Sequence, residues 1–474
     1  MTTRTTPDPA PAFPASGTTR PTVADRVEQG RSWRRTAPLD TLGDWSPAPD
    51  RLDPVSVLGA QDASRVPELV PIRYGRMSAS PFAFYRGSAA VMAADLATLP
   101  RTAGVTQLCG DAHVANFGVY AAADRSLVFD INDFDETLPG PFEWDVLRLA
   151  ASLVLAARDR GFERSVARDA ARAAARAYRL ATVDLARQRN LDVWYARVDE
   201  DRIMRAVDAA KAGKRAHRTA ASTFDKARGR TSLRAAEKLT ELVDGRLRFR
   251  EAPPLISREP LSALDREQAD TLFESYRSTL DDPLRRLLDR FEPVDAARKV
   301  VGVGSVGTRA YVLLLAGRDD DDPLILQLKQ AQASVLEKHL GASEYGHSGQ
   351  RVVNGQRYAQ AASDILLGWV TGPGGFDFYV RQLHDMKGSI DLARVRRRGL
   401  VTLASLCGST LARAHARSGD AVAVAAYLGH DTDDDAFDKA VGRFARRYAD
   451  QAESDAARLD DAIRSGDVEA VTGV

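Results

Sequence analysis

Two carboxylates and an amide stand close together in the sequence, in an order suited to phosphoryl transfer. Residues 109–118 are Cys-Gly-Asp-Ala-His-Val-Ala-Asn-Phe-Gly, which places Asp111 and Asn116 in one short segment. An apolar segment over 126–131 follows, and Asp133 comes soon after it. We expect strand–loop–strand–loop here, so that all three side chains can reach one point. Phosphoryl transfer uses an Asp to orient or deprotonate the acceptor hydroxyl, and an Asn and an Asp to hold magnesium against the phosphates.

This segment resembles the catalytic segment of the aminoglycoside and choline kinase branch of the protein-kinase-like superfamily. That pattern is His-Gly-Asp-x-His-x-x-Asn, then a strand, then Ile-Asp-Phe-Asp. Its motif positions are matched within residues 110–135, and Cys109 replaces the first His. The resemblance implies that Asp111 is the catalytic base and that Asn116 and Asp133 are the metal ligands.

Several neighbouring residues have roles that the sequence leaves open. His113 is either a metal ligand or a residue that braces the loop, and the resemblance favours the brace. Asp130 competes with the preferred metal ligand three residues later, and Asp135, the last residue of Asp-Phe-Asp, is a further candidate. Arg381 either contacts phosphate or forms an ion pair. The resemblance also implies that Asp145, in the sequence Glu-Trp-Asp-Val-Leu, braces the catalytic loop from behind.

A glycine-rich motif follows much later in the chain, where residues 302–307 are Gly-Val-Gly-Ser-Val-Gly. A dinucleotide-binding fingerprint should open a helix, whereas residues 308–315 are rich in β-formers and predict a strand. With a second strand predicted over 298–301, the glycines cap a hairpin, as in the kinase loop that covers the ATP phosphates. The nucleotide-binding residues predicted in this loop are Gly302, Gly304, Ser305 and Gly307.

A lysine stands at the end of the next predicted strand. Residues 324–328 are apolar and β-forming, and Lys329 follows them. A Lys at the end of the third strand is the phosphate-binding position of kinases. A helix predicted over 331–340 carries Glu337, which we expect to pair with this lysine.

The two motifs stand in reversed order. A kinase chain runs from the Gly-rich loop through the Lys and Glu to the catalytic loop and the metal-binding Asp, whereas this chain has the catalytic loop first. We therefore infer a circular permutation, which preserves the packing of elements when the chain is cut elsewhere. A strand predicted over 377–383 takes the hinge position, and a helix over 400–417 resembles the one that precedes the catalytic loop.

The predicted fold class is α+β, a two-lobed and circularly permuted protein-kinase-like fold. A disordered tail over 1–45, rich in Pro, Thr, Ala and Arg, precedes a large helical lobe over 46–290 that holds the catalytic loop. A small antiparallel-sheet lobe over 291–390 carries the Gly-rich loop. C-terminal helices over 391–474 pack on the helical lobe.

Five segments form a further pattern along the chain. They are Ser-Pro-Phe-Ala-Phe-Tyr-Arg-Gly at 80–87, Gly-Asp-x-His-x-x-Asn-Phe-Gly at 110–118, Gln-Ala-Ala-Ser-Asp at 360–364, Tyr-Val-Arg-Gln-Leu at 379–383 and Asp-Met-Lys-Gly-Ser at 385–389. With these segments the chain resembles the bacterial family called domain of unknown function 2252. The resemblance covers most of residues 70–455 and gives a family without an assigned reaction.

Composition limits the possible partners. The 474 residues suffice for two or three domain-sized units. Lys and Arg number 66 and Asp and Glu 65, a net charge of +1, which argues against bulk attraction to nucleic acid or membrane. Two cysteines imply no disulfide framework. No apolar run approaches the roughly 20 residues that cross a bilayer, and the N-terminus lacks the apolar region of a signal peptide. We expect a cytoplasmic protein.

A basic stretch over 205–240 contains Lys211, Lys214, Arg215, His217 and Arg218. It is either a solvated helix face, the interpretation we favour, or a lid that meets an anionic substrate.

Three functions remain open. The leading one is a phosphotransferase that uses ATP and Mg²⁺ and acts on a small hydroxylated acceptor of unknown identity. A metal-dependent phosphoesterase would use two metals to activate water. It needs several His ligands, and of the 7 His only His113 lies near the carboxylates in sequence. A non-catalytic nucleotide-binding module is the third. A kinase-like cleft places the Lys329 ammonium within a few to about ten ångströms of the Asp133 carboxylate, since one triphosphate and its metal must bridge them.

Overall fold

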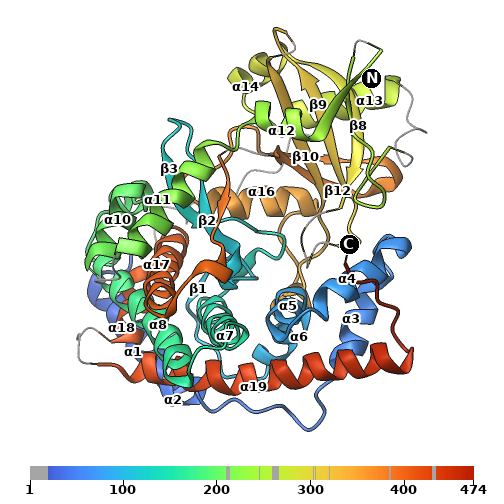
Figure 1. Ribbon diagram of the computed structural model, residues 1–474. Helices are drawn as coiled ribbons and strands as arrows, with labels where there is room; N and C mark the ends of the chain where they lie inside the picture. The colour runs from blue at the N-terminus through green and yellow to red at the C-terminus, as the bar shows by residue number, and fades with distance from the viewer. Residues whose placement is uncertain are drawn as a thin grey trace, which may run out of the picture.

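Helices and antiparallel sheets make up this α+β chain. The computed structural model describes residues 20–209, 214–244, 246–258, 266–300, 302, 304, 306–319, 321–383, 386–429 and 434–473. Figure 1 shows two parts, a six-stranded sheet with its helices at the top and a body of helices below it. Lys211 and Ser305 lie outside the described residues.

The six-stranded sheet carries the Gly-rich motif at one end. Its strands run in the order β11-β12-β10-β9-β8-β7, and each pair is antiparallel. The loop between β8 and β9 contains the glycines, so the predicted hairpin is confirmed. The strands are β7 (Ile256–Ser257), β8 (Glu292–Lys299), β9 (Ala310–Ala316), β10 (Pro323–Gln330), β11 (Gly368–Thr371) and β12 (Asp377–Gln382).

Successive side chains of each strand point to opposite faces of this sheet, and both faces are apolar. Helices therefore cover both faces. On β9, Val312 and Leu314 pack with α12 (Ser232–Leu239), whereas Leu315 packs with the helices α13 (Arg266–Arg277) and α14 (Asp282–Leu288). The sheet with α12, α13 and α14 is called the sheet region below. The sheet region begins well before residue 290, whereas the sheet lobe was predicted to begin at residue 291.

The remaining strands of the described chain form smaller sheets. The hairpin of β2 and β3 lies between the two loops of the first motif, and β13 extends it. The pairs are β1 (Val105–Leu108) with β4 (Leu138–Pro141), β2 (Phe117–Ala121) with β3 (Leu127–Ile131) and β13 (Gly388–Ser389), and β5 (Thr240–Val243) with β6 (Arg246–Phe249). The strands predicted before each loop are therefore present.

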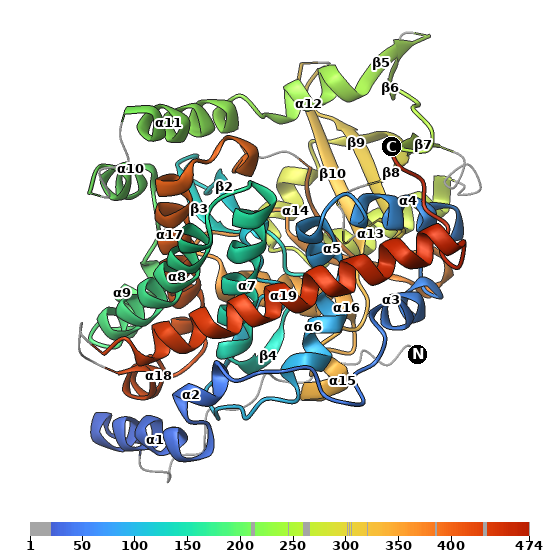
Figure 2. The ribbon, with the colours of Figure 1, turned by 60° about the horizontal axis from the view of Figure 1, so that its bottom comes forward.

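The helical body packs around α7, in which nearly every residue is buried. Small side chains let α8 and α17 approach closely, and a Cβ on Gly408 would stand 2.1 Å from the Ala174 carbonyl oxygen. The helices α7, α8, α17, α18 and α19 are called the helical region. They are α7 (Glu143–Asp159), α8 (Arg164–Leu185), α17 (Arg397–Ala416), α18 (Ala421–Leu428) and α19 (Ala436–Ser465). Figure 2 shows α19 crossing in front of α7 and α8 toward α3 and α4.

The N-terminal segment is folded from residue 23 onward, which corrects the disordered tail predicted over 1–45. A capping box between Thr22 and Asp25 starts α1, and Gly30 packs against the backbone of α18. Composition alone could not show that this helix finds a groove. The helices are α1 (Val23–Thr36), α2 (Leu39–Leu42), α3 (Pro54–Asp62), α4 (Val70–Met77), α5 (Pro81–Gly87) and α6 (Ala89–Leu96). Residues 1–19 lie outside the described range.

Further helices cover the β2–β3 hairpin and the sheet, and one of them, α15, is a single turn. Of the helix predicted over 331–340, only α15 is helical, so most of that prediction is wrong. Residues 331–336 instead follow the edge of the candidate site. The helices are α9 (Asn190–Tyr195), α10 (Glu200–Ala209), α11 (Lys214–Arg228), α15 (Glu337–Leu340) and α16 (Ser348–Ala359). No helix within the described ranges is both long and apolar enough to cross a membrane.

Candidate functional site

Both motifs line one cavity of about 100 Å³. Residues of the first motif and of the Gly-rich loop stand on its wall together, although the motifs lie far apart in the chain. The predicted site residues on its wall are Asp111, His113, Asn116, Asp133, Asp135, Gly302 and Gly304, and Gln61, Arg65, Arg86, Gly87, Ala89 and Glu136 join them.

A buried carboxylate fixes the start of the loop that carries Asp111, the predicted catalytic loop. Asp145, at the first turn of α7, accepts hydrogen bonds from the backbone N–H groups of Cys109 at 2.8 Å and Gly110 at 3.1 Å. His415 of α17 lies 3.2 Å from the same carboxylate and 2.9 Å from the Tyr178 hydroxyl. The predicted brace is therefore confirmed, and the helices α7, α8 and α17 all contribute to it.

Gly110 allows the two loops of the motif to touch. Its φ of 81° lies in the left-handed region, and a Cβ there would stand 2.1 Å from the Glu136 carbonyl oxygen. Only glycine meets both requirements without strain. The loop that carries Asp111 is thus pressed against the loop that carries Asp133.

The proposed base is held by an arginine. Arg148 of α7 donates from Nε to the Asp111 carboxylate at 2.8 Å, and its guanidinium lies 3.9 Å from the ring centre of Tyr85. The Asn116 amide nitrogen donates to the Asp111 carbonyl oxygen at 2.8 Å, which leaves the amide oxygen available. Both side chains therefore have defined directions before any ligand binds.

The second loop meets the lysine of β10. The Lys329 ammonium lies 3.6 Å from the Asp133 carboxylate and forms an ion pair with Asp135. Tyr379 of β12 also donates its hydroxyl to Asp135 at 2.9 Å. The distance between Lys329 and Asp133 falls within the range predicted from the sequence.

Electrostatics separates the two carboxylates of this loop. Burial opposes ionisation of Asp133, but Lys329 and the neighbouring Arg381 and Lys387 hold its pKa well below the ordinary value. Burial and the adjacent charge of Asp133 raise the pKa of Asp135. Asp133 is therefore the more readily ionised carboxylate of the pair.

Glu337 does not pair with Lys329, which corrects that prediction. Its carboxylate instead accepts from the Ser334 N–H at 2.9 Å and lies 3.8 Å from the Arg351 guanidinium. Arg351, on α16, donates to the Asp135 carbonyl oxygen at 2.8 Å. The predicted helix that would have carried the glutamate to the lysine is largely absent from the described residues 331–340, and Asp135 takes its place.

Asp130 is a structural residue, so its candidacy as a metal ligand is wrong. It is fully buried near the end of β3 and pairs with Arg413 of α17. It also accepts from the Ala361 N–H at 2.8 Å. With these partners it points away from the cavity, whose wall it does not join.

His113 stands on the cavity wall, 3.6 Å from the Asp111 carboxylate. Burial lowers its pKa to about 4, and the charges of Arg86 and Arg148 act in the same direction. The imidazole is therefore neutral at pH 7. Its role as a loop brace stays a prediction.

The N-terminal helices hold the Gly-rich loop by its carbonyl groups. Arg76 of α4 donates to the Gly302 carbonyl at 2.6 Å, and Arg65 donates to the Gly304 carbonyl at 3.2 Å. The Val66 N–H donates to the Gly307 carbonyl at 2.7 Å. These bonds hold the described glycines of the loop at their carbonyl oxygens, close to the N-terminal helices.

Sequence reasoning missed three charged residues of the cavity, Arg65, Arg86 and Glu136. Arg86, the arginine of the segment 80–87, has a buried Nε with no hydrogen-bond partner among the described residues. Burial lowers its pKa, while Asp111 and Asp133 oppose that change. Burial also raises the pKa of Glu136 to about 7. The only sequence signal for Arg86 was its place in the segment 80–87, which carries the family resemblance.

Arg381 lies behind the site, on the wall of a separate small cavity of about 50 Å³. Its Nε donates to Gln327 at 3.2 Å, and its guanidinium lies 5.6 Å from the Tyr379 ring centre. Lys387 lines the same small cavity, and burial lowers its pKa to about 7. The Arg381 side chain therefore supports the site electrostatically from the sheet side.

Oxygen donors dominate the ligand set of the main cavity. Among the described parts of the chain, no group of three or more His, Cys, Asp and Glu stands in a metal-holding arrangement. Magnesium commonly takes one or two carboxylates and completes its shell with waters and phosphates. Asp133 and the amide oxygen of Asn116 fit that requirement.

The chain belongs to a bacterial family of uncharacterised proteins. The family model described as "Uncharacterized protein conserved in bacteria (DUF2252)" matches residues 65–462. No curated protein and no solved structure matches.

Proposed function

We propose that this protein is a phosphotransferase that uses ATP and Mg²⁺, with a circularly permuted kinase-like architecture. One observation carries the proposal: residues of the catalytic loop and the Gly-rich loop line one cavity, with the Lys329 ammonium 3.6 Å from the Asp133 carboxylate. Two half-sites for a nucleotide are useful only if they close on one ligand.

The cavity suits a metal-bound triphosphate in its donors and its charge. Asp133 and Asn116 offer oxygen atoms to Mg²⁺, and Arg86 offers a buried N–H, unpaired among the described residues, to an anion. Gly302 and Gly304 stand on the cavity wall, where a glycine-rich backbone can approach phosphate oxygens closely. Bound ATP with Mg²⁺ would supply the transferable phosphoryl group.

The protein's own residues divide the remaining work. Asp111, oriented by Arg148, accepts a hydrogen bond from the acceptor hydroxyl and takes its proton as the phosphoryl group moves. Lys329 leaves Asp135 for the phosphates, as kinase lysines contact them. Arg86 stabilises negative charge near the transferred group.

The order of elements also supports the permutation. Following β8 along the chain, one meets the Gly-rich loop, β9, β10 with its lysine, the helix α16 and then β11 and β12. A kinase small lobe carries its Gly-rich loop and β3 lysine in this order, ahead of the αC helix. One departure stands out, because Asp135 rather than a helix glutamate pairs with Lys329.

Nucleotide binding and turnover test the proposal together. The purified full chain is titrated with a fluorescent ATP analogue in Mg²⁺ and in EDTA, and ADP release is measured with a panel of small hydroxylated acceptors. We expect Mg²⁺-dependent binding, and ADP release that rises with a suitable acceptor. Absence of nucleotide binding in both conditions contradicts the proposal.

The same assay separates the two other functions. Hydrolysis of a phosphate ester without nucleotide supports the phosphoesterase, and Mg²⁺-dependent binding without turnover across the panel supports a binding module. A cytosolic setting suits all three, and Cys109 and Cys407 are both free and buried.

A further inference from the structure

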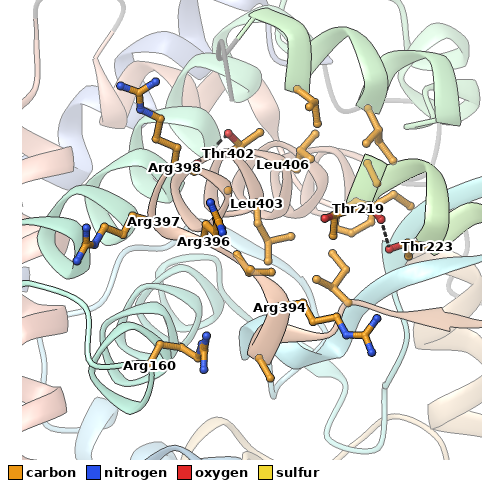
Figure 3. A pocket seen from close by; sticks show the side chains of 18 of the residues that line it. Arg160, Thr219, Thr223, Arg394, Arg396, Arg397, Arg398, Thr402, Leu403 and Leu406 are labelled. Atoms are coloured by element: carbon orange, nitrogen blue, oxygen red, sulfur yellow. Dashed lines mark hydrogen bonds between the residues drawn. The ribbon is translucent and has the colours of Figure 1, made fainter. Parts of the chain in front are cut away.

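A second, larger cavity lies on the other side of the β2–β3 hairpin. Its volume is about 1240 Å³, and it shares no lining residue with the candidate site among the described parts of the chain. The hairpin, the turn between α7 and α8, the helices α10 and α11, and the first turns of α17 enclose it. Figure 3 shows Leu403 and Leu406 of α17 beside Thr219 and Thr223 of α11.

The floor of this cavity is apolar. Its side chains belong to the main core, so the cavity reaches down to the core of the molecule. The floor residues are Val119, Phe129, Ile203, Val207, Phe224 and Leu403. Such a floor favours hydrocarbon over polar groups.

Polar groups on the cavity wall are already engaged. The Thr223 hydroxyl donates to the Thr219 carbonyl at 2.9 Å, and the Thr402 hydroxyl donates to the Arg398 carbonyl at 3.0 Å. A peptide would bury backbone N–H and C=O groups that need partners. The wall therefore suits an alkyl chain better than a polypeptide.

The rim is strongly cationic. Arg397 pairs with Glu163 at 2.7 Å and Arg394 with Asp391 at 3.0 Å, and these pairs are exposed. Arg160, Arg396 and Arg398 have no ion pair with any described residue. In Figure 3, Arg396 lies over Leu403 near the centre of the view, whereas Arg397 and Arg398 extend away from it.

The positive charge continues into an adjoining cavity of about 490 Å³. The two cavities share Thr219, Thr223, Ile390 and Arg394. The second adds Arg218, Lys226 and Arg230, and Asp391 is its one acidic lining residue among those described. In a chain with a net charge of +1, this is a marked local excess.

We propose that this cavity binds an amphipathic anion, a single molecule with a phosphate or carboxylate group and an alkyl chain. Arg160 and Arg396 hold the anionic group at the rim, and the chain lies against Phe129, Phe224 and Leu403. The volume slightly exceeds the roughly 300–1,000 Å³ of ordinary ligand pockets, which leaves room for a long chain. Of the basic stretch, Lys214 lines this cavity and Arg218 lines the adjoining one, so α11 then forms one wall of a ligand site, a different role from the solvated face favoured by its sequence.

Binding of a monomeric amphiphile tests this site. The purified full chain is titrated calorimetrically with dodecyl phosphate below its micelle concentration, and with dodecanol as the uncharged analogue. We expect saturable binding of one molecule, at least about 10-fold tighter for the phosphate and weaker at high salt. No saturable binding, or equal affinity for the two compounds, overturns the proposal.

Variants assign the binding to the cavity. The double variant Arg160→Gln/Arg396→Gln should lose at least about 10-fold in affinity, whereas the exposed control Arg285→Gln on α14 should not change it. Ala220→Trp fills the cavity from α11 and should abolish binding, while its fluorescence and the unfolding transition report the fold. Unchanged affinity in the folded double variant, or in folded Ala220→Trp, contradicts the assignment.

Two further ligands identify the source of the anion. Phosphatidylglycerol vesicles and a dodecapeptide of aspartate and leucine are titrated in the same way. Binding to the vesicles without binding of monomeric dodecyl phosphate would indicate a membrane surface, and equal binding of the peptide would indicate an acidic segment. Either result overturns the single-molecule site, and neither bears on phosphoryl transfer.

Discussion

The two sides of the candidate site are held by different kinds of contact. The side formed by residues 109–116 rests on buried partners, with Asp145 fixing two backbone N–H groups and Arg148 fixing Asp111. The described part of the Gly-rich loop, called the cover below, is bonded at its carbonyls by Arg65 and Arg76, and the bond from Arg76 to Gly302 is exposed to solvent. Buried charge-assisted bonds cost more to break than exposed ones. We therefore expect the contacts of the first side to contribute more stability than the bond from Arg76 to the cover.

Removing the proposed metal ligand should give the largest effect. Asp133→Ala should lower Mg²⁺-dependent turnover at least about 100-fold, because the metal held by this carboxylate would neutralise charge on the transferred group. Steady-state ADP release and a denaturant unfolding curve measure activity and fold. The control is Asp124→Ala, at the opposite end of the β2–β3 hairpin, which should keep full turnover. Normal turnover in a folded Asp133→Ala protein removes this residue from the mechanism.

Arg86 should matter to the chemical step more than to nucleotide affinity. Arg86→Gln should lower kcat by about 10- to 100-fold and change the nucleotide KM by less than about 3-fold, because its side chain lines the cavity and interacts with Asp111 and Asp133. The exposed Arg168→Gln serves as the matched control. A large rise in KM with unchanged kcat would place Arg86 with the cover instead.

The brace behind the catalytic loop should appear as a loss of stability. Asp145→Asn should lower the free energy of unfolding by about 1–3 kcal/mol, because buried N–H groups lose a charged acceptor. Asp438→Asn, which breaks the buried pair with Arg179 in the helical region, should destabilise the fold without a specific loss of turnover. If the two variants lose the same activity per folded molecule, the brace has no special link to the site.

Glu136 should make stability depend on pH. Its folded-state pKa of about 7 lies above the ordinary 4.5, so the folded state binds more protons between those values and stability falls as the pH rises. Glu136→Gln removes this penalty. The variant should match the native protein near pH 4.5 and exceed it by about 3 kcal/mol at pH 8, in urea unfolding at both values. A constant difference between them would contradict the shifted pKa.

Loosening the cover should give the smallest effect. Arg76→Gln should raise the nucleotide KM by about 2- to 5-fold and leave kcat within about 2-fold, since an exposed bond contributes little. Initial rates over a range of ATP concentrations measure both constants. A loss of turnover comparable with that of Asp133→Ala would show that the Arg76 bond matters as much to turnover as the proposed metal ligand.

Local patterns predicted the elements that carry the site. Alternating β-formers around the glycines indicated the hairpin of β8 and β9, and the apolar run ending at Lys329 indicated β10. The order of motif residues predicted that Asp111 and Asp133 share a cavity with this loop. These features depend on neighbours in the sequence or on a motif whose spacing is short.

Partners across the fold were harder to predict. Arg86 and Arg148 reach the site from α5 and α7, and nothing local distinguishes them from surface arginines. Glu337 was expected to pair with Lys329 because helical spacing was assumed for 331–340, yet the chain there is mostly non-helical and follows the edge of the site. Asp130 and Asp133 stand three residues apart, and only the fold shows that one faces Arg413 and the other faces the cavity.

The buried partners of the catalytic loop have a consequence for synthesis. Asp130 and Asp145 are translated early, but Arg413 and His415, which pair with them, are made some 270 residues or more later. A ribosome-bound chain that ends before α17 therefore lacks the guanidinium that pairs with Asp130 and the imidazole that contacts Asp145. Burying Asp130 without its cationic partner carries a strong penalty. The final packing behind the site is thus a late event that waits for α17.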